Sequence, residues 1–415
     1  MSARHQTAAI ALVVLFFCCC VPATPPVRNG LDRLIETKFA EIRGLRVGLI
    51  VNHTSCAVDG RHAVDLFAEA DSVDLQAIFC PEHGFRGEQE GGDAVSTASD
   101  PRTGLPVYSL YGEIRRPTAE MVQDLDAMVF DIQDVGTRFY TYISTLFLCM
   151  QTAAEHDLRF FVLDRPNPIG GTVVEGPVLS PEFSSFIGIA PIALRHGMSA
   201  GELALLFNQT GWLTAGPPID LTVIPCSGWQ RQRTFSATGL AWIPPSPNMI
   251  SPQTALLYPG TGLLEGTNVS EGRGTDDPFR LIGAPWLDAT ELCRQLKINH
   301  PIGVEFDTMS FIPRSIPGKS LHPKYMDQLC QGLYFTVTDP DSFRAVELGV
   351  GLMTALHQLH PQEFSLREER LNKLLGTDLL VSALKNERNP DELISLWQSE
   401  LHEFMQQRKK ALIYP

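Results

Sequence analysis

Basic residues are scarce in this sequence relative to acidic ones. Lys and Arg number 33 against 47 Asp and Glu, which gives a formal net charge of -14. Proteins that bind nucleic acid or an anionic membrane surface need a basic footprint. We therefore expect neither as the main partner, although a small basic pocket is compatible with this balance.

The sequence also lacks the short motifs of several common enzyme classes. No GxGxxG follows the first predicted strand and no GxxxxGK[ST] occurs, so neither NAD nor ATP is expected as a cofactor. No HExxH and no CxxC occur, so no metal site is predicted. The cysteines outside the N-terminal segment are scattered singly, which favours buried thiols over disulfides: Cys56, Cys80, Cys149, Cys226, Cys293 and Cys330.

The longest apolar run of the sequence lies at the N-terminus, and no later run is long enough to cross a bilayer. Arg4 precedes an apolar stretch over residues 8–20, and "VPA" follows with small residues up to Ala23. This pattern is typical of a secretory signal peptide over residues 1–23 and predicts a periplasmic or secreted protein. A membrane anchor and a lipid-modified cysteine are the alternatives. The run is short for a membrane span, and the residues before Cys18 fit a lipid-attachment motif poorly.

The remaining composition is that of a folded protein, with 44% hydrophobic and 19% charged residues in 415. Continuous apolar segments predict buried strands at 45–52, 75–80, 107–111, 126–134 and 159–164. Helical patterns at 62–70, 118–125 and 143–157 alternate with them. This alternation predicts an α/β fold, a Rossmann-like doubly wound parallel sheet, over residues 40–213.

The second half of the chain has a different pattern. Ser199 and Glu202 form a capping box before a helix that ends near Gly211. Residues 214–275 are rich in Pro and Gly and predict a long ordered loop. Helices at 289–297 and 341–360, strands at 304–313 and 332–339, and two final helical segments predict a smaller α+β domain over residues 214–415, whose loop closes a cleft.

Polar side chains gather where the predicted strands end. Ligands of doubly wound sheets bind at the carboxyl ends of the strands. A second constellation lies among five glycines between Gly260 and Gly274. Together these predict catalytic residues at Glu82, His83, Asp131, Glu265 and Glu271, and substrate-binding residues at Asn52, Arg86, Gln133, Asp134, Arg138, Asp164, Asn167, His196, Asn248, Asn268 and Arg273.

Glu82 is the residue best placed for acid catalysis. Cleavage of a glycosidic bond typically needs a carboxylic acid that protonates the leaving oxygen. Glu82 comes directly after an apolar strand and Pro81, where desolvation would raise its pKa. Glu88 and Glu90 lie further along the loop and are expected in solvent. The group acting opposite Glu82 stays open between Asp131, Asp164, Glu265 and Glu271.

Several long segments resemble one known family. "PEHGFRGEQEGG", "FDIQDVGTRFYTYIST", "LDRPNPIGG", "RHGMSAGELA", "WIPPSPNM" and "YPGTGLLEGTNVSEGRGTDDPF" are similar to the bacterial DUF1343 proteins, which include exo-β-N-acetylmuramidases of the NamZ type. The resemblance extends from about Leu45 to the C-terminus. It implies a Rossmann-like domain, a smaller domain and a cleft between them. It also implies release of terminal non-reducing N-acetylmuramic acid from peptidoglycan fragments, with Glu82 of the PEHG segment as the catalytic glutamate.

The expected substrate is a muropeptide or a MurNAc–GlcNAc disaccharide, whose lactyl group carries a carboxylate. Arg86, Arg138, Arg165 or Arg273 could pair with it in bidentate fashion, and Arg138 and Arg273 are preferred because of their loop positions. A glycosidase for another amino sugar and a non-catalytic muropeptide-binding protein are the alternatives. No cofactor is expected.

Overall fold

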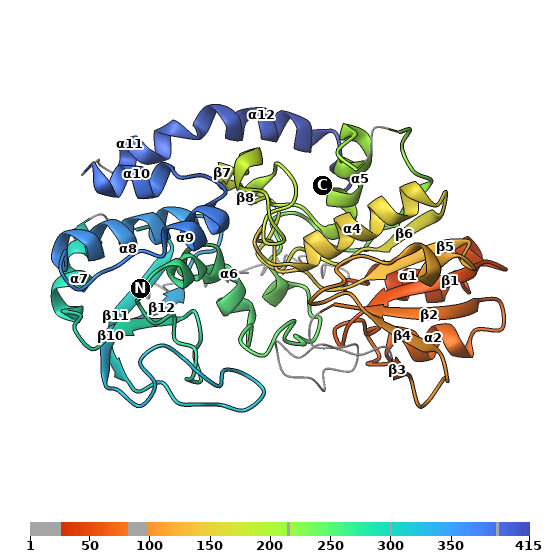
Figure 1. Ribbon diagram of the computed structural model, residues 1–415, viewed down its shortest axis with the longest axis horizontal. Coiled ribbons are helices and arrows are strands. Elements are labelled where there is room, and N and C mark those ends of the chain that lie inside the picture. Colours follow the sequence, from red (N-terminus) through yellow and green to blue (C-terminus); the bar gives the residue numbers. More distant parts are fainter. Residues whose placement is uncertain (1–25, 82–97, 214–215, 299–300, 387–389) are drawn as a thin grey trace, which may run out of the picture.

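The computed structural model describes residues 26–81, 98–213, 216–298, 301–386 and 390–415. Figure 1 shows two parts side by side, each built around a β-sheet, with the C-terminal helices crossing above both. The first sheet has the strand order β3-β4-β2-β1-β5-β6-β9. Its strands are β1 (Arg46–Val51), β2 (Asp74–Cys80), β3 (Ala98–Ser99), β4 (Pro106–Ser109), β5 (Ala127–Asp131), β6 (Arg159–Leu163) and β9 (Leu221–Ile224).

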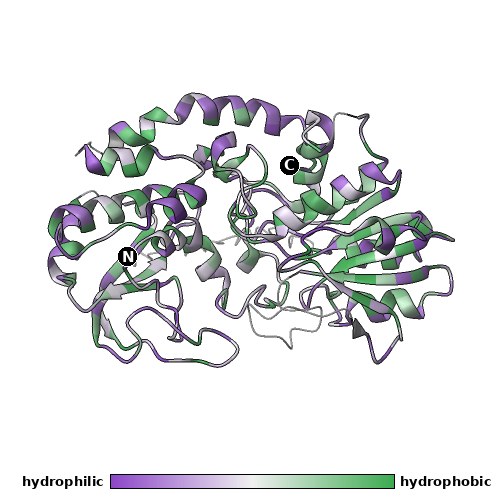
Figure 2. Ribbon diagram, in the orientation of Figure 1, coloured by the Kyte–Doolittle hydropathy of each residue, from purple (hydrophilic) through white to green (hydrophobic). Residues whose placement is uncertain are grey.

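All neighbours in this sheet are parallel except the short β3, which is antiparallel to β4. Successive side chains of a strand point to opposite faces. In β1, Val47, Leu49 and Val51 belong to one apolar cluster, whereas Ile50 belongs to the other. Burial on both faces explains why these strands are continuously apolar, which Figure 2 shows as green ribbons.

Helices cover both faces of the first sheet. The helices are α1 (Gly30–Glu36), α2 (Ala63–Glu69), α3 (Ala119–Val122), α4 (Tyr142–Glu155) and α5 (Ala200–Thr210). Side chains of α1 and α2 join the cluster on one face, and those of α4 and α5 join the cluster on the other. The predicted capping box is present at α5, and Gly211 ends that helix in the left-handed conformation. The doubly wound sheet predicted from the sequence is confirmed.

The second part of the fold contains a three-stranded antiparallel sheet in the order β10-β12-β11. Its strands are β10 (Leu281–Ala284), β11 (Val304–Phe311) and β12 (Cys330–Val337), and a separate pair is formed by β7 (Glu175–Val178) and β8 (Ala193–Arg195). The helices are α6 (Pro252–Thr261), α7 (Ala289–Ile298), α8 (Ala345–Leu359), α9 (Glu368–Leu375), α10 (Leu379–Lys385), α11 (Pro390–Leu396) and α12 (Gln398–Lys409). This smaller α+β unit was also predicted.

Helices α6 and α8 cross at very short distance because two glycines meet there. A Cβ atom added to Gly260 would lie 1.9 Å from the carbonyl oxygen of Ala345, and one added to Gly349 would lie 2.7 Å from the carbonyl oxygen of Gly260. Any larger residue at Gly260 would force the helices apart. This crossing places the end of α6, with Tyr258 and the following turn, beside the first sheet.

The chain end ties the two parts together. Helix α12 runs from the second part back to α5, above β7 and β8 (Figure 1). Beyond it, the hydroxyl of Tyr414 donates to Asp164 at 2.5 Å, and the Arg231 amide donates to the carbonyl of Pro415 at 3.0 Å. The last residues therefore contact the carboxyl edge of the first sheet.

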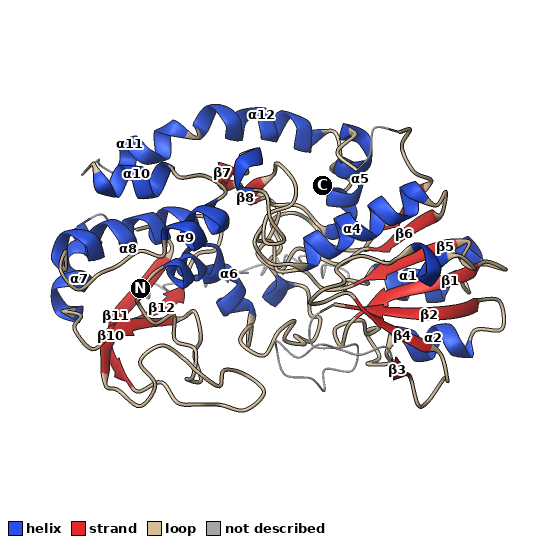
Figure 3. Cartoon of the chain, in the orientation of Figure 1, coloured by secondary structure: helices blue, strands red, loops and turns tan. Residues whose placement is uncertain are grey.

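The structure differs from the sequence predictions mainly between residues 214 and 275. This segment was predicted as one loop, but it contains the strand β9 and the helix α6, the latter labelled and drawn in blue in Figure 3. The strand β9 follows the predicted domain boundary at 213/214 and pairs with β6, so the first sheet continues past that point. Four described helices, α9 to α12, close the chain where two were predicted, and α1 was not predicted.

Two further observations concern cysteines and membrane-spanning length. The six described cysteines carry free thiols, and all except the half-buried Cys56 are buried, as the sequence predicted. Within the described residues, no helix combines the length and apolar character needed to cross a bilayer.

Candidate active site

A cavity of about 850 Å³ opens between the two parts of the molecule. This volume lies within the range of roughly 300–1,000 Å³ typical of small-molecule sites. The first part supplies the segments after β4 and β5, and the second supplies α6, α9 and the glycine-rich turn, which comprises residues 260–274. The loop between the separate strands β7 and β8 completes the lining. The functional side chains in its lining include Tyr111, Arg115, Tyr140, Tyr142, Ser185, Asn248, Tyr258, Glu265, Arg273, Lys319, Arg370 and Lys373.

One wall of the cavity is aromatic. The rings of Tyr140 and Tyr142 meet edge to face at 5.0 Å, and Tyr140 meets Tyr258 at 6.0 Å. Tyr258 also contacts Phe279 at 4.7 Å. Burial raises the pKa of Tyr140 well above its ordinary value, so its phenol stays protonated and can donate a hydrogen bond. The wall therefore offers mainly aromatic ring surface to a ligand.

Glu265 is a charged carboxylate in the cavity lining. It accepts hydrogen bonds at 2.8 Å from both Arg273 and Arg370. Burial alone would raise the pKa of Glu265, but the charges of the two guanidinium groups hold it below its ordinary value. Glu265 is thus ionised at neutral pH and suited to act as a base or to orient a positively charged or N–H group.

Glu271, by contrast, contacts Arg273 but does not line the cavity. Its side chain is 5% exposed and forms ion pairs with Lys324 at 2.8 Å and with Arg273 at 3.3 Å. Lys324 also donates to the carbonyls of Leu264 and Val269. Glu271 therefore holds the glycine-rich turn together and orients Arg273 from behind.

The other positively charged side chains of the cavity lining, Lys373, Arg115 and Lys319, differ in whether they have an acidic partner among the described residues. Lys373 pairs with the exposed Glu369 at 2.6 Å. The Nε of Arg115 donates to the carbonyl of Gly112 at 3.3 Å, and its guanidinium lies 4.7 Å from the centre of the Phe186 ring. Among the described residues, neither Arg115 nor Lys319 has an acidic partner. These two cations remain available to an anionic ligand.

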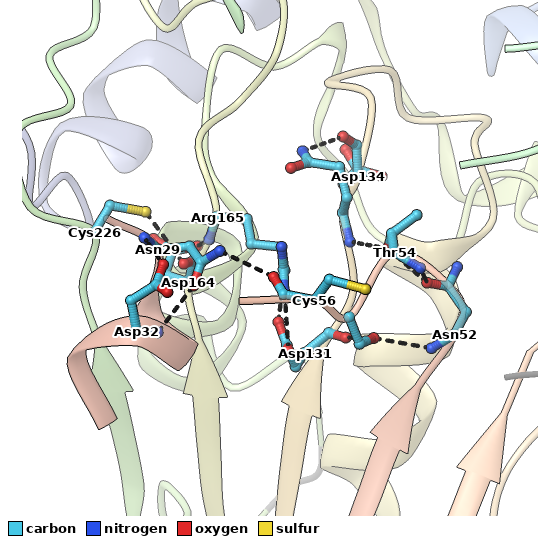
Figure 4. Close-up of polar contacts among 12 residues, drawn as sticks. Asn29, Asp32, Asn52, Thr54, Cys56, Asp131, Asp134, Asp164, Arg165 and Cys226 are labelled. Atoms are coloured by element: carbon cyan, nitrogen blue, oxygen red, sulfur yellow. Dashed lines mark hydrogen bonds and ion pairs between the residues drawn. The ribbon is translucent and has the colours of Figure 1, made fainter. Parts of the chain in front are cut away.

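The ends of β1, β5 and β6 form a hydrogen-bonded network (Figure 4). Arg165 forms a bidentate ion pair with Asp131, in which Nε donates to Oδ1 at 2.6 Å and Nη2 donates to Oδ2 at 3.0 Å. The side-chain oxygen of Asn52 accepts hydrogen bonds from the backbone amide and the hydroxyl of Thr54, at 2.9 and 2.6 Å. The Thr54 hydroxyl in turn accepts a hydrogen bond from the backbone amide of Gln133 at 3.0 Å. The network fixes the strand ends, and Asp131 is fully buried within it.

Asp164 stands in a second buried network. Its carboxylate accepts from the hydroxyls of Ser199 and Tyr414 at 2.6 and 2.5 Å and from the Gly201 amide at 2.8 Å. Burial raises the pKa of Asp164 to about 6, against the lowering effect of these donors. The residue anchors the start of α5 and the chain end and is fully buried, so it does not reach the cavity.

Asp134 and His196 lie close together without a direct hydrogen bond. Burial raises the pKa of Asp134 to about 7, and burial lowers that of His196 to about 3, so the imidazole stays neutral. His196 Nε2 lies 3.9 Å from Asp134 Oδ2, which accepts from the Gly136 amide at 2.7 Å. In the described part of the chain, Asp134 Oδ1 and His196 Nε2 have no hydrogen-bonding partner.

Three predicted substrate-binding residues instead hold the backbone. Arg138 is 1% exposed, and its guanidinium donates to the carbonyls of Pro177, Ile192, Leu374 and Leu375. Asn167 donates to the Met198 carbonyl and closes its own turn. Asn268 bonds to the backbone of residues 363 and 365. A loop position suggested ligand contact for Arg138, but tertiary packing buries it between the two parts.

Glu82, His83 and Arg86 lie outside the described residues. The described chain before them ends at the buried Pro81, directly after β2. The carbonyl of Cys80 accepts from the Leu110 amide at 2.8 Å, and the next residue, Tyr111, lines the cavity. The end of β2 is therefore next to the cavity wall.

Several lining residues were not predicted from the sequence. Tyr140 and Tyr142 follow a strand end in "RFYTY", and this aromatic cluster after polar residues was a usable signal. Arg370 and Lys373 lie one turn apart on α9, more than a hundred residues after Glu265, and no local pattern points to them. No group of three or more His, Cys, Asp and Glu side chains suited to a metal ion occurs among the described residues.

The sequence matches two domain descriptions of a single family. Residues 47–253 match the N-terminal domain of exo-β-N-acetylmuramidase NamZ, and residues 256–414 match its C-terminal domain. The peptidoglycan β-N-acetylmuramidase NamZ of Bacillus subtilis (strain 168) is 43% identical over 391 residues, which cover 94% of this chain and 92% of that protein.

Solved structures of relatives have the same fold. A DUF1343 family protein from Bacteroides fragilis NCTC 9343 superposes with a TM-score of 0.87 at 33% identity, over 94% of this chain and 99% of that one. A second DUF1343 protein from the same organism gives a TM-score of 0.76 at 32% identity, with the same coverage. With both domains matched in order and the relatives covered almost completely, the chain belongs to the exo-β-N-acetylmuramidase NamZ family, also called DUF1343.

Proposed function

We propose that this protein is an exo-acting glycoside hydrolase that releases terminal non-reducing N-acetylmuramic acid from peptidoglycan fragments. One observation carries the proposal. The cavity between the two parts holds an ionised glutamate, an aromatic wall and two cations without an acidic partner among the described residues, in a chain 43% identical to a muramidase over 94% of its length. Such a cavity suits a sugar that bears a carboxylate.

In this proposal Glu82 is the general acid and Glu265 is the charged group opposite it. Of the four carboxylates considered for the second role, Glu265 is the one that lines the cavity within the described residues. Asp131 and Asp164 are fully buried in networks, and Glu271 lies behind Arg273. The ionised Glu265 can activate water or orient the acetamido group of the sugar, two roles that glycosidases assign to a second polar group.

For the lactyl carboxylate we propose Arg115 in place of three arginines expected from the sequence, Arg138, Arg165 and Arg273; the fourth, Arg86, lies outside the described residues. Arg138 is committed to backbone carbonyls, Arg165 to Asp131, and Arg273 to two glutamates. Because the Nε of Arg115 is bonded to Gly112 and its plane is stacked on Phe186, its two terminal nitrogens are oriented for a bidentate carboxylate. Ile187 beside it offers an apolar contact for the lactyl methyl group.

The decisive experiment is incubation of purified protein and its Glu82→Gln variant with MurNAc–GlcNAc, followed by product analysis. We expect the wild type to release free MurNAc and GlcNAc. The variant should lose about two to four orders of magnitude in rate, the usual contribution of a general acid. Full activity of Glu82→Gln would remove Glu82 from the mechanism.

The same assay separates the alternatives. Turnover of a glucosaminide in preference to the muraminide would assign the enzyme to another amino sugar. Binding of muropeptides without any product would identify a non-catalytic cell-wall binding protein. We further propose that residues 1–23 act as a signal peptide and direct the mature chain to the periplasm or the exterior. N-terminal sequencing of the protein from fractionated cells tests this, because an intact Met1 would contradict it.

A further inference from the structure

A second, smaller cavity of about 220 Å³ lies at the carboxyl edge of the first sheet. Its polar lining comes from the segments after β1, β5 and β6, through Thr54, Gln133 and Arg165. The sheet order changes direction between β1 and β5, because β2 and β4 lie on one side and β6 and β9 on the other. Ligands of doubly wound sheets bind at such a switch point.

This cavity shares no lining residue with the cavity assigned to the active site. One segment separates the two. Leu240, Ala241 and Ile243 face the small cavity, whereas residues 246–249 face the large one. The intervening backbone is fixed on both sides, since His53 Nε2 lies 2.8 Å from the Pro244 carbonyl and the Tyr142 hydroxyl donates to that of Pro245 at 2.6 Å.

Arg165 brings a hydrogen-bond donor to the floor of the small cavity. It is 8% exposed, and Asp131 occupies its Nε and Nη2, with a further bond from Nη2 to the Cys56 carbonyl at 3.1 Å. Nη1 has no protein partner among the residues described. The side chain of Arg165 is thus more than nine-tenths buried, and Nη1 is the nitrogen that remains available to a ligand in the cavity.

Gln133 brings an acceptor to the same floor. Its Nε2 donates to the carbonyls of Asp134 and Pro166 at 2.8 and 3.0 Å. Only the NH₂ group of the Gln133 side chain can donate to two carbonyls, so these bonds determine how the side-chain amide is oriented. Its oxygen, Oε1, is then the atom available to accept a hydrogen bond. No described residue donates to Oε1, although Gln133 is only 6% exposed.

The charge of the site favours a neutral ligand. The guanidinium of Arg165 is balanced by Asp131, with which it forms a salt bridge at 2.6 Å. Asp32 is also buried nearby, where its carboxylate accepts from the amides of Asn29 and Val58. An anionic ligand would therefore find no unpaired positive charge among the described residues that line this cavity.

We propose that the small cavity is a binding site for an acetamido or peptide amide group. Such a group supplies a carbonyl for Arg165 Nη1, an N–H for Gln133 Oε1 and an apolar substituent for the walls formed by Phe235, Leu240 and Ile243. The volume is below the roughly 300–1,000 Å³ of sites for whole drug-sized ligands, so a small molecule or a single group of a larger one fits. The amide can come from an N-acetylated sugar or from a peptide.

Cys56 provides a local reporter for this site. It lines the small cavity and is half-buried, whereas the other described cysteines are buried. Burial raises the pKa of Cys56, so modification with a maleimide is carried out at mildly alkaline pH and mapped by mass spectrometry of the peptide. N-acetylglucosamine and N-acetylalanine amide are the two amide probes, and glucose is the probe that lacks the amide.

We expect an amide probe at ten times its Kd to slow the modification of Cys56 about tenfold, since only the unoccupied fraction reacts. Glucose should have no effect. Protection by N-acetylglucosamine alone would identify a sugar site, and protection by the alanine amide alone a peptide site. Unchanged modification with both amide probes, or equal protection by glucose, would overturn the proposal.

Direct titration of variants gives an independent test. Val58 is 48% exposed at the mouth of the cavity, so Val58→Trp should fold and obstruct the entrance, whereas Val58→Thr should leave it open. We expect calorimetric binding of the protecting probe to be retained in Val58→Thr and lost in Val58→Trp. Equal affinity in both variants would place the probe elsewhere. Val58 does not line the active-site cavity, so muraminide turnover by both variants should match the wild type whatever the small cavity binds.

Discussion

At the scale of single residues, partners and burial assign different roles to side chains of the same chemical type. Glu265 and Glu271 are six positions apart and share Arg273, yet only Glu265 lines the cavity in the described structure. The three predicted arginines of the described region are likewise all committed to protein partners. A charged residue in a conspicuous loop is thus not by itself evidence of a ligand contact.

Glu265→Gln tests the role of the cavity carboxylate. The substitution keeps the shape but removes the charge that Arg273 and Arg370 now share. We expect kcat for the muraminide to fall by about two orders of magnitude or more, as for loss of a positioned base. Glu369→Gln, which removes the exposed partner of Lys373, is the matched control and should retain wild-type kcat. An unchanged kcat in Glu265→Gln would assign the opposing group to another residue.

Arg115→Gln tests recognition of the lactyl group. Hydrogen bonds to a charged group contribute about 1.5–3 kcal/mol, so KM for a muraminide should rise by about one to two orders of magnitude. KM for the matching glucosaminide, which has no lactyl carboxylate, should change little. The neighbouring Arg116 pairs with Glu155 outside the cavity, so Arg116→Gln is the control. A similar rise in KM for both substrates would contradict the assignment.

At the scale of elements, the start of α5 and the end of α6 are each fixed by contacts with distant parts of the chain, and Tyr258 near the end of α6 lines the larger cavity. The start of α5 is fixed by its own capping box and by Asp164 of β6's end, to which the Ser199 hydroxyl donates at 2.6 Å. The end of α6 is fixed by its crossing with α8 at Gly260. These local features were visible in the sequence as a capping pattern and as a glycine, but the contacts they make with distant elements were not.

Ser199→Ala should destabilise the protein through α5. Loss of the cap costs about 1 kcal/mol, and loss of the donor to the buried Asp164 adds to it. Urea denaturation followed by circular dichroism measures the difference in unfolding free energy. Ser180 precedes a short 3-10 helix without a side-chain cap bond, so Ser180→Ala should change the stability by much less. Equal losses in the two variants would contradict the role of the cap.

At the scale of the whole molecule, the chain end connects two parts that each have their own sheet. The Tyr414 hydroxyl accepts from the Cys226 amide at 2.9 Å and donates to Asp164. Arg408 adds bonds to the carbonyls of Gly171, His196 and Gly197. These last residues therefore attach the end of the chain to the first part of the fold.

Tyr414→Phe should therefore lower stability without altering the cavity lining. It leaves the buried Cys226 amide without its acceptor, which costs about 1–3 kcal/mol. A decrease in the thermal unfolding midpoint, with KM unchanged at a temperature where both proteins are folded, is the expected outcome. Tyr334→Phe, which removes a long 3.4 Å contact with Asp277, is the control. A Tyr414→Phe protein as stable as the wild type would show that the chain end contributes little.

The sequence by itself determined the doubly wound sheet, because burial on both faces requires continuously apolar strands, and those strands are visible without any partner. It also determined the polar strand ends and the glycine-rich turn with Glu265. Only the tertiary structure decided which of these side chains reach the cavity. Arg138 lies 237 positions from Leu375 and Glu265 lies 105 positions from Arg370, and contacts at such separations leave no local periodicity to detect. Burial and pairing are properties of the assembled fold, and they distinguish a ligand-binding charge from one that holds the backbone.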